Sequence, residues 1–320
     1  MRDAGAGEAA GVWVFDDAGG AETLARFRAD ARPVLRKLVL RKLRRGVARA
    51  VLGAVAEKAG ARGWALQQLD VTACGLRDAD LAALAEHCSA VRGLALRRMR
   101  DLTGSALVAF APSTRVLRAE GIRLGSRDLR IVGVHADRLL ELSLDDAADA
   151  ACGWSALLPA GLLTLRVRRG CGSMGARELR KLPTTLPKLG SLKLGGAPVD
   201  REALCAWGAA LRKGTWGLAD LALAHCRLEG ISAVAQTLSR SGVLWLGPHG
   251  ASRSLHGLQG ARLARLTLQA PVDDALLSGL RTVSELRVEG ARQVPAHKRA
   301  RAEEVLGSRC QVSWVESTRW

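Results

Sequence analysis

A leucine-x-leucine pair that returns every 20 to 31 residues is the feature of this 320-residue sequence that most restricts its fold. The first members of these pairs are Leu38, Leu69, Leu94, Leu117, Leu142, Leu165, Leu192, Leu221, Leu244, Leu266 and Leu286, with Val312 as a weaker last member. Alternating apolar residues place two side chains on one face of a short strand, and a single strand cannot bury that face. A period of roughly 20–29 residues is typical of repeats that stack into a solenoid with a shared core.

One repeat near the N-terminus shows the whole unit. Leu66, Leu69 and Val71 fit the spacing L-x-x-L-x-L and predict a strand. A helix follows, and one apolar stripe on it is made by Leu81, Leu84, Ala85 and Cys88. Either Asp78 or Asp80 stands where a carboxylate caps the first turn of that helix. Strand, turn, helix and return make one coil of a solenoid.

This pattern resembles the leucine-rich repeat superfamily, over about residues 33 to 316. The repeat above looks like the cysteine-containing subtype, which is F-box-associated and ribonuclease-inhibitor-like. The matching positions are Cys74, Asp80, Leu81, Leu84, Ala85 and Cys88, and Cys226 is a second cysteine after a strand. The resemblance implies an α/β horseshoe of about 11–12 repeats, with parallel strands on the concave face and helices or turns on the convex face.

The composition along the chain suggests four parts. Residues 1–22 are expected to be a flexible or docking leader whose apolar patch at 12–15 could form an edge strand, and residues 23–60 a basic N-terminal cap with the first repeat. Residues 61–290 hold the repeats, and 291–320 form a C-terminal cap with a helix near 296–306 and a strand near 310–315. For residues 35–40, a strand of the first coil and a continuous basic helix starting after Pro33 are both open. The glycine- and serine-rich segment 247–260 predicts a loop.

The positive charge of the chain is concentrated near its N-terminus. The formal net charge is +17, and ten Lys or Arg stand between Arg26 and Arg49 against the single acid Asp30. Such a segment attracts polyanions through counterion release. The polyanion-binding candidates are Arg36, Lys37, Arg41, Lys42, Arg44 and Arg45. The alternative is that the charge reflects composition and covers a solvated surface.

No motif with catalytic or metal-binding spacing is present. The sequence lacks C-x-x-C, H-E-x-x-H and a phosphate loop that ends in Gly-Lys-Ser/Thr. The glycine-rich run at 170–175 has no lysine to close it. The pairs His87–Cys88 and His225–Cys226 are explained better as repeat positions than as ligands. We therefore expect no enzyme activity, no cofactor and no metal site.

Residues between and just after the two leucines of each pair would point outward from the concave face. The predicted partner-binding residues there are Arg97, Arg118, Arg166, Arg168, Lys193 and Trp245. With strands roughly 5 Å apart, the cations would form a basic band about 20 Å wide, interrupted by Glu120 and Asp145. The alternative is a solvated surface with internal ion pairs. For Trp245, a contact anchor and burial under the 247–260 loop are both open.

Binding is the function that these features favour. We expect a non-catalytic protein-binding scaffold or adaptor, a subunit of a complex with another protein. Relatives with an F-box would imply substrate recognition for a ubiquitin ligase, but residues 23–60 lack that motif. The alternative is a basic structural subunit associated with RNA or a ribonucleoprotein, against which stands the absence of Tyr and of stacking platforms. We expect a cytoplasmic or nuclear location for three reasons. The seven cysteines are scattered, no apolar run is long enough to span a membrane, and the acidic first segment has no signal or transit character.

Overall fold

A computed structural model describes residues 11–30, 35–62, 65–149, 154–169, 175–226, 231–238, 242–246, 263–268, 280, 283–289, 295–306 and 310–315. The chain divides into two compact units. The N-terminal unit holds Met1–Asp149 with Leu157–Pro159, and the C-terminal unit holds Ala150–Ala156 with Ala160–Trp320. The four parts expected from the composition stay a prediction.

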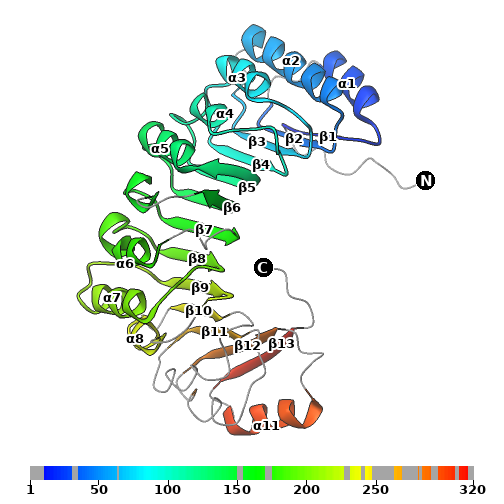
Figure 1. The fold of residues 1–320 in the computed structure, drawn as a ribbon. Coiled ribbons are helices and arrows are strands. Elements are labelled where there is room, and N and C mark those ends of the chain that lie inside the picture. Colours follow the sequence, from blue (N-terminus) through cyan, green and yellow to red (C-terminus); the bar gives the residue numbers. More distant parts are fainter. Residues whose placement is uncertain are drawn as a thin grey trace. The chain divides into compact units, whose positions relative to one another are not determined.

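In the N-terminal unit, parallel strands lie side by side in chain order, and helices cover one side of them (Figure 1). The strands are β1 (Val12–Asp16), β2 (Lys37–Arg41), β3 (Gln68–Thr72), β4 (Gly93–Arg97), β5 (Val116–Gly125) and β6 (Glu141–Asp149). The helices are α1 (Gly20–Ala29), α2 (Arg45–Arg62), α3 (Asp78–His87), α4 (Ser105–Val108) and α5 (Ser126–His135). A short 3₁₀ helix, η1 (Trp154–Leu157), follows β6 along the chain.

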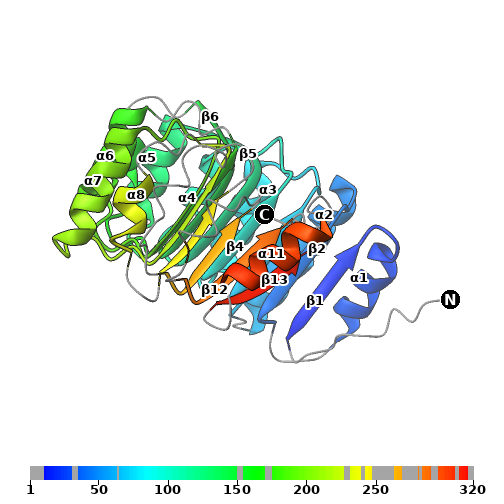
Figure 2. The same ribbon diagram turned by 90° about the horizontal axis from the view of Figure 1, so that it is seen from below.

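The C-terminal unit repeats this arrangement, and Figure 2 shows its strands running in one direction. Its strands are β7 (Thr164–Arg169), β8 (Ser191–Gly195), β9 (Asp220–Ala224), β10 (Val243–Leu246), β11 (Arg265–Leu268), β12 (Glu285–Glu289) and β13 (Gln311–Val315). Its helices are α6 (Ala176–Thr185), α7 (Arg201–Arg212), α8 (Ile231–Ala235) and α11 (Ala296–Leu306). The predicted helix at 296–306 and the strand near 310–315 are therefore confirmed.

The leucines of successive coils stand opposite one another, as the repeat pattern predicts. In the N-terminal unit Leu69 pairs in register with Leu38 on one side and with Leu94 on the other. In the C-terminal unit Leu221 stands between Leu192 and Leu244 in the same way. Each of these six side chains is at most 2% exposed. Full burial of a leucine contributes roughly 1.5–3 kcal/mol, so the stacked leucines form the core of each unit.

The described residues form thirteen strands, whereas the leucine pattern predicted about 11–12 repeats. The additional strand is β1, where Trp13 and Phe15 take the positions of the two leucines and stand opposite Leu38 and Leu40. Phe27 of α1 packs edge-on against both aromatic rings, with centroids 5.0 and 5.8 Å away. This aromatic cluster covers the same face that leucines bury elsewhere, so the count of leucine pairs did not include the strand. The edge strand suggested by the apolar patch at 12–15 is confirmed.

The structure decides two alternatives that the sequence leaves open. Residues 37–41 form strand β2, paired with β1 and β3, so no continuous helix starts after Pro33. At α3 it is Asp80 that serves the helix start, because its carboxylate accepts the N–H of Arg77 at 2.9 Å, while Asp78 binds Thr103. The predicted 247–260 loop and the run at 170–174 lie outside the described residues.

Candidate binding surface

The side of each sheet that faces away from the helices is lined by the strand residues that alternate with the buried leucines. We call this side the open face of each unit. On the N-terminal unit, its middle row holds Val39, Asp70, Ala95, Arg118 and Ser143, which stand opposite one another on successive strands. All the predicted concave-face residues lie on the open face of one unit or the other.

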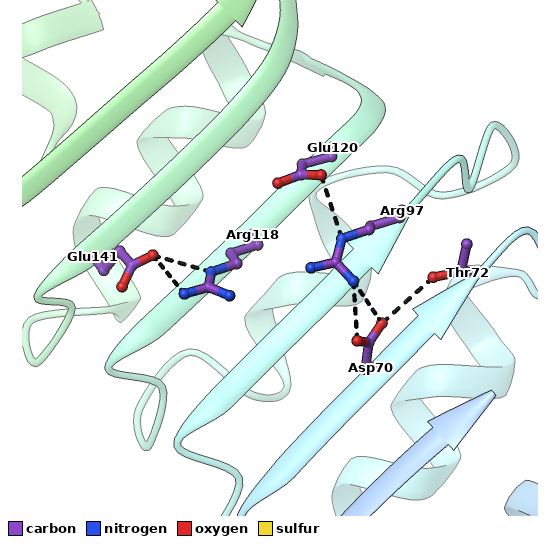
Figure 3. Close-up of polar contacts among 6 residues, drawn as sticks. All are labelled: Asp70, Thr72, Arg97, Arg118, Glu120 and Glu141. Carbon is purple, nitrogen blue, oxygen red and sulfur yellow. Dashed lines mark hydrogen bonds and ion pairs between the residues drawn. The ribbon is translucent and has the colours of Figure 1, made fainter. Parts of the chain in front are cut away.

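Arg97 of β4 is held between two carboxylates on the neighbouring strands (Figure 3). Its guanidinium donates to Asp70 of β3 at 3.0 and 3.2 Å and to Glu120 of β5 at 3.3 Å. Asp70 also accepts the hydroxyl of Thr72 at 3.4 Å. The charge of Arg97 is therefore balanced within the sheet.

Arg118 and Lys193 follow a common rule, each pairing with an acid at the first position of the next strand. Arg118 of β5 binds Glu141 of β6 at 3.0 Å, as Figure 3 shows. In the other unit, Lys193 of β8 lies 3.3 Å from Asp220 of β9. These partly exposed pairs contribute only about 0–1 kcal/mol each. Arg118, Lys193 and Arg97 are therefore all engaged in internal ion pairs, which was the alternative to a free basic band.

The other predicted residues of the C-terminal unit are half-buried or buried. Arg166 and Arg168 lie half-buried on the open face of β7. Trp245 of β10 is only 8% exposed, and its indole packs on Ala222 and Ala224 of the neighbouring strand. Trp245 is therefore not the exposed anchor that one alternative foresaw.

The six polyanion-binding candidates are divided between the two ends of β2. Arg36 and Lys37 stand where the strand begins, whereas the other four stand where it ends and α2 starts. The side chains of Arg36, Arg41, Lys42 and Arg44 are exposed. Arg45 is half-buried and lies 3.5 Å from the carboxylate of Asp80.

A hollow of about 350 Å³ lies on the open face of the N-terminal unit, over strands β2 to β5. Its floor is low because β4 carries two small residues, Gly93 and Ala95, at successive open-face positions. The lining comprises Lys37, Gln67, Gln68, Leu69, Asp70, Arg92, Gly93, Leu94, Ala95, Arg97, Arg115, Val116 and Arg118. Five of these residues are cations and one is an acid, which leaves a formal charge of +4 on the lining. We call this feature the basic hollow.

Two arginines of the basic hollow, Arg92 and Arg115, were not singled out from the sequence. Both stand two residues before the first leucine of a pair, where the chain enters a strand. The carbonyl of Arg92 accepts the N–H groups of Arg115 and Val116 at 2.8 and 3.0 Å, which locks the two entry segments side by side. Aligning the repeats and comparing this position in each of them would have found both arginines, since Arg36 occupies it before β2, two coils earlier than Arg92.

The cations of the basic hollow differ in whether a carboxylate balances them. Arg97 and Arg118 are paired, as described above. Within the part of the chain that the structure describes, Lys37, Arg92 and Arg115 form no ion pair. Arg92 and Arg115 are also exposed. The side of the hollow where the strands begin is therefore an uncompensated positive surface that can attract an anion.

The buried thiols of the repeats have a structural role. The Cys74 thiol donates to the carbonyl of Thr72 at 3.2 Å, and the Cys226 thiol donates to Ala224 at the same distance. Burial raises the pKa of Cys226, and likewise that of Cys88, to about 11. The thiolate is the nucleophile and the metal ligand, so these cysteines stay inert near neutral pH. Among the described residues, no group of three or more His, Cys, Asp and Glu is placed to hold a metal ion.

Comparisons with known proteins give matches at the level of the backbone. No protein-family model and no curated protein matches the chain. One matching solved structure is a TLR13–ssRNA13 complex, with 15% identity, a TM-score of 0.43 and 88% of this chain covered. The chain spans about half, 54%, of that protein's length.

A second matching structure is an internalin (inlF) from Listeria monocytogenes str. 4b F2365, with 12% identity and a TM-score of 0.43. The match covers 93% of this chain and 89% of the internalin. Among the described helices, none is long and apolar enough to cross a membrane. The chain's own parallel strands and stacked leucines show that it folds as an α/β leucine-rich repeat solenoid.

Proposed function

We propose that this protein is a non-catalytic binding scaffold whose N-terminal unit holds an acidic segment of a partner protein on its open face. The observation that supports this proposal is the basic hollow, where three cations without ion pairs stand at one side of a floor of small residues. Anionic side chains of a partner would gain charge-assisted hydrogen bonds there. The low floor at Gly93 and Ala95 lets a partner's backbone approach the sheet closely.

A protein segment fits this surface better than a long polyanion. The cations without ion pairs lie where the strands begin, while Asp70, Glu120 and Glu141 stand on the neighbouring open-face positions. These carboxylates already pair with Arg97 and Arg118, so a nucleic acid that followed the sheet would gain no further phosphate contact from those two cations. A polypeptide can place an anion at the hollow and uncharged residues beyond it.

The proposal is tested by placing a photo-crosslinking amino acid at one of two exposed positions of the same unit. Gln68 lines the basic hollow, and Glu57 lies on α2, on the side that the helices cover. We expect a partner from the native source to be cross-linked from position 68 and not from position 57. Cross-linking from position 57 alone would place the partner on the helices and reject the proposal.

Substrate recognition for a ubiquitin ligase is a narrower form of the same proposal. It draws support only from the cysteine positions, of which Cys74, Cys88 and Cys226 are buried as the subtype requires. Co-purification of ligase subunits with the wild-type protein is the expected result. If a partner is cross-linked but no ligase subunit co-purifies, the scaffold proposal is kept and the ubiquitin-ligase role is rejected.

A second candidate function, contact with RNA or a ribonucleoprotein, is favoured by the exposed cations at the end of β2. Arg41, Lys42 and Arg44 form no ion pair within the described residues. If they contact phosphates, replacing all three by Gln should reduce the slope of log affinity against log salt by about 2–3 for a nonspecific single-stranded RNA. An unchanged slope would exclude these residues as the contact.

A further inference from the structure

The cations without ion pairs in the basic hollow come from three different coils but share one space. Arg92 and Arg115 enter the neighbouring strands β4 and β5, whose backbones lie about 4.8 Å apart. Lys37 lies at the start of β2 on the same lining. The amides of Gln67 and Gln68 lie between them along the row and add neutral donors. The hollow thus offers many more donors than one carboxylate can accept.

The only acid on the lining is already neutralised. Asp70 takes two hydrogen bonds from Arg97, at 3.0 and 3.2 Å, so it offers little repulsion to an anion on the other side of the hollow. A carboxylate carries a single negative charge, which one guanidinium already balances. A phosphate monoester carries a charge near −2 and three strong acceptor oxygens, which match two arginines and a lysine.

We propose that the basic hollow binds the phosphate group of one phosphorylated side chain in an extended partner segment. The inference rests on the proposed function and adds the chemistry of the recognised group. Arg92 and Arg115 donate to the phosphate oxygens, and Lys37 neutralises the remaining charge. Ala95 and Gly93 leave the room beneath, so the group sits in the hollow rather than on a flat sheet.

The experiment measures binding of peptide libraries to the full chain by fluorescence anisotropy. The probes share degenerate flanks and carry phosphoserine, phosphothreonine, phosphotyrosine, glutamate or serine at a fixed centre. We expect at least about tenfold tighter binding of one phosphorylated library than of the glutamate and serine libraries, the effect of one to two charge-assisted hydrogen bonds.

Three variants identify the site. Arg92→Gln/Arg115→Gln removes two of the donors and should abolish the preference for phosphate. Ala95→Leu leaves the charge unchanged but fills the floor of the hollow, and should reduce the affinity for the phosphorylated probe about tenfold. The matched control, Arg130→Gln/Arg138→Gln, removes two exposed arginines of the same unit away from the hollow and should bind as the wild type does.

The outcomes separate this inference from the proposed function. Equal binding of the glutamate and phosphorylated libraries, still lost in Arg92→Gln/Arg115→Gln, would overturn the phosphate inference and leave the acidic-segment scaffold. Binding of single-stranded RNA through the hollow without binding of any peptide would overturn both. Equal loss of binding in the control variant would show a general charge effect and overturn the inference. Urea unfolding of each variant shows whether a loss arises from the fold.

Discussion

At the scale of single residues, the turn after a strand is imposed by the neighbouring coil. The residue that follows a strand has a φ between 52° and 70° at Lys42, Ala73, Arg98, Gly196 and His225. This left-handed region favours glycine, yet only one of the five is glycine. The N–H of Ala73 donates to the carbonyl of Arg97 in the next coil at 2.9 Å, and Gly196 donates to Ala224 at 2.7 Å. Stacking of the coils therefore holds the strained conformation.

Exchanging alanine and glycine at this turn should change stability in opposite directions. Left-handed backbone costs alanine about 1–2 kcal/mol, and the extra entropy of unfolded glycine offsets about 0.5–1 kcal/mol. We expect Ala73→Gly to raise the free energy of unfolding by about 0.5–1 kcal/mol, measured in urea. Gly196→Ala should lower it by a similar amount, because a Cβ there meets no neighbouring atom and only the backbone matters. Changes of the same sign in both variants would contradict this account.

The buried thiols make stability depend on pH in the alkaline range. Burial raises the pKa of Cys226 to about 11, from an unfolded value of about 8.5–9. The folded state therefore keeps its proton while the unfolded state loses it, so the contribution is complete below about pH 8.5 and is lost as the pH rises toward 11. Across that pH window, the free energy of unfolding of the wild type should fall by about 2–3 kcal/mol more than that of Cys226→Ala. If the free energies of unfolding of the variant and the wild type change in parallel with pH, the Cys226 thiol does not cause this pH dependence.

At the scale of elements, the strands supply a uniform core while the helices pack through particular contacts. Trp207 of α7 is fully buried, and its indole N–H donates to the carbonyl of Leu179 in α6 at 2.7 Å. On the other side of α7, Gly208 lies against the backbone of Ala233 in α8. A Cβ at Gly208 would overlap the Ala233 carbonyl, so the spacing of these helices requires glycine at this position.

A pair of glycine-to-alanine substitutions within helices tests this close approach. Gly208→Ala should lower the free energy of unfolding by about 1–3 kcal/mol, because the helices must separate. Gly53→Ala in α2 is the control, since a Cβ there meets nothing within 4 Å. It should raise the same quantity by about 0.5–1 kcal/mol through helix propensity alone. A stabilising Gly208→Ala would show that α7 and α8 are not packed at this distance.

At the scale of the whole molecule, each coil is stabilised by the coils beside it in the chain. Within each unit every strand pairs with its sequence neighbours, so stability spreads from coil to coil rather than through one central core. The charge is likewise local, because carboxylates on adjacent strands balance Arg97, Arg118 and Lys193. A net charge of +17 therefore says less about binding than the few cations left without ion pairs.

Local coupling predicts how a core substitution spreads. Leu94→Ala removes a buried side chain from β4 and should cost about 2–5 kcal/mol. We expect amide hydrogen exchange to accelerate in β3, β4 and β5, with little change in β8 and β9. The measurement is exchange followed by mass spectrometry on the native protein. Equal acceleration in all these strands would mean that the chain unfolds as one cooperative body.

The sequence predicted the strands well because burial repeats with the coil. Leu69, Leu94 and Leu221 were placed on strands and paired with their expected neighbours. The count of leucine pairs left out β1, because Trp13 and Phe15 take the places of leucine there, whereas the apolar patch at 12–15 did suggest the edge strand that the structure has. The binding surface was predicted less well. Its face was named, but Arg92 and Arg115 lie just outside the L-x-L pairs, so they were not considered.

The order of the coils, the buried leucines and the open face follow from the sequence by itself, because hydrophobic burial is non-directional and needs only a regular apolar pattern. The tertiary structure alone decided which charges are balanced. Arg97 meets Asp70 from 27 positions earlier in the chain, whereas Arg92 meets no carboxylate among the described residues. Ion pairs and hollows depend on distances of a few ångströms between side chains of different coils, and only the stacked coils set those distances.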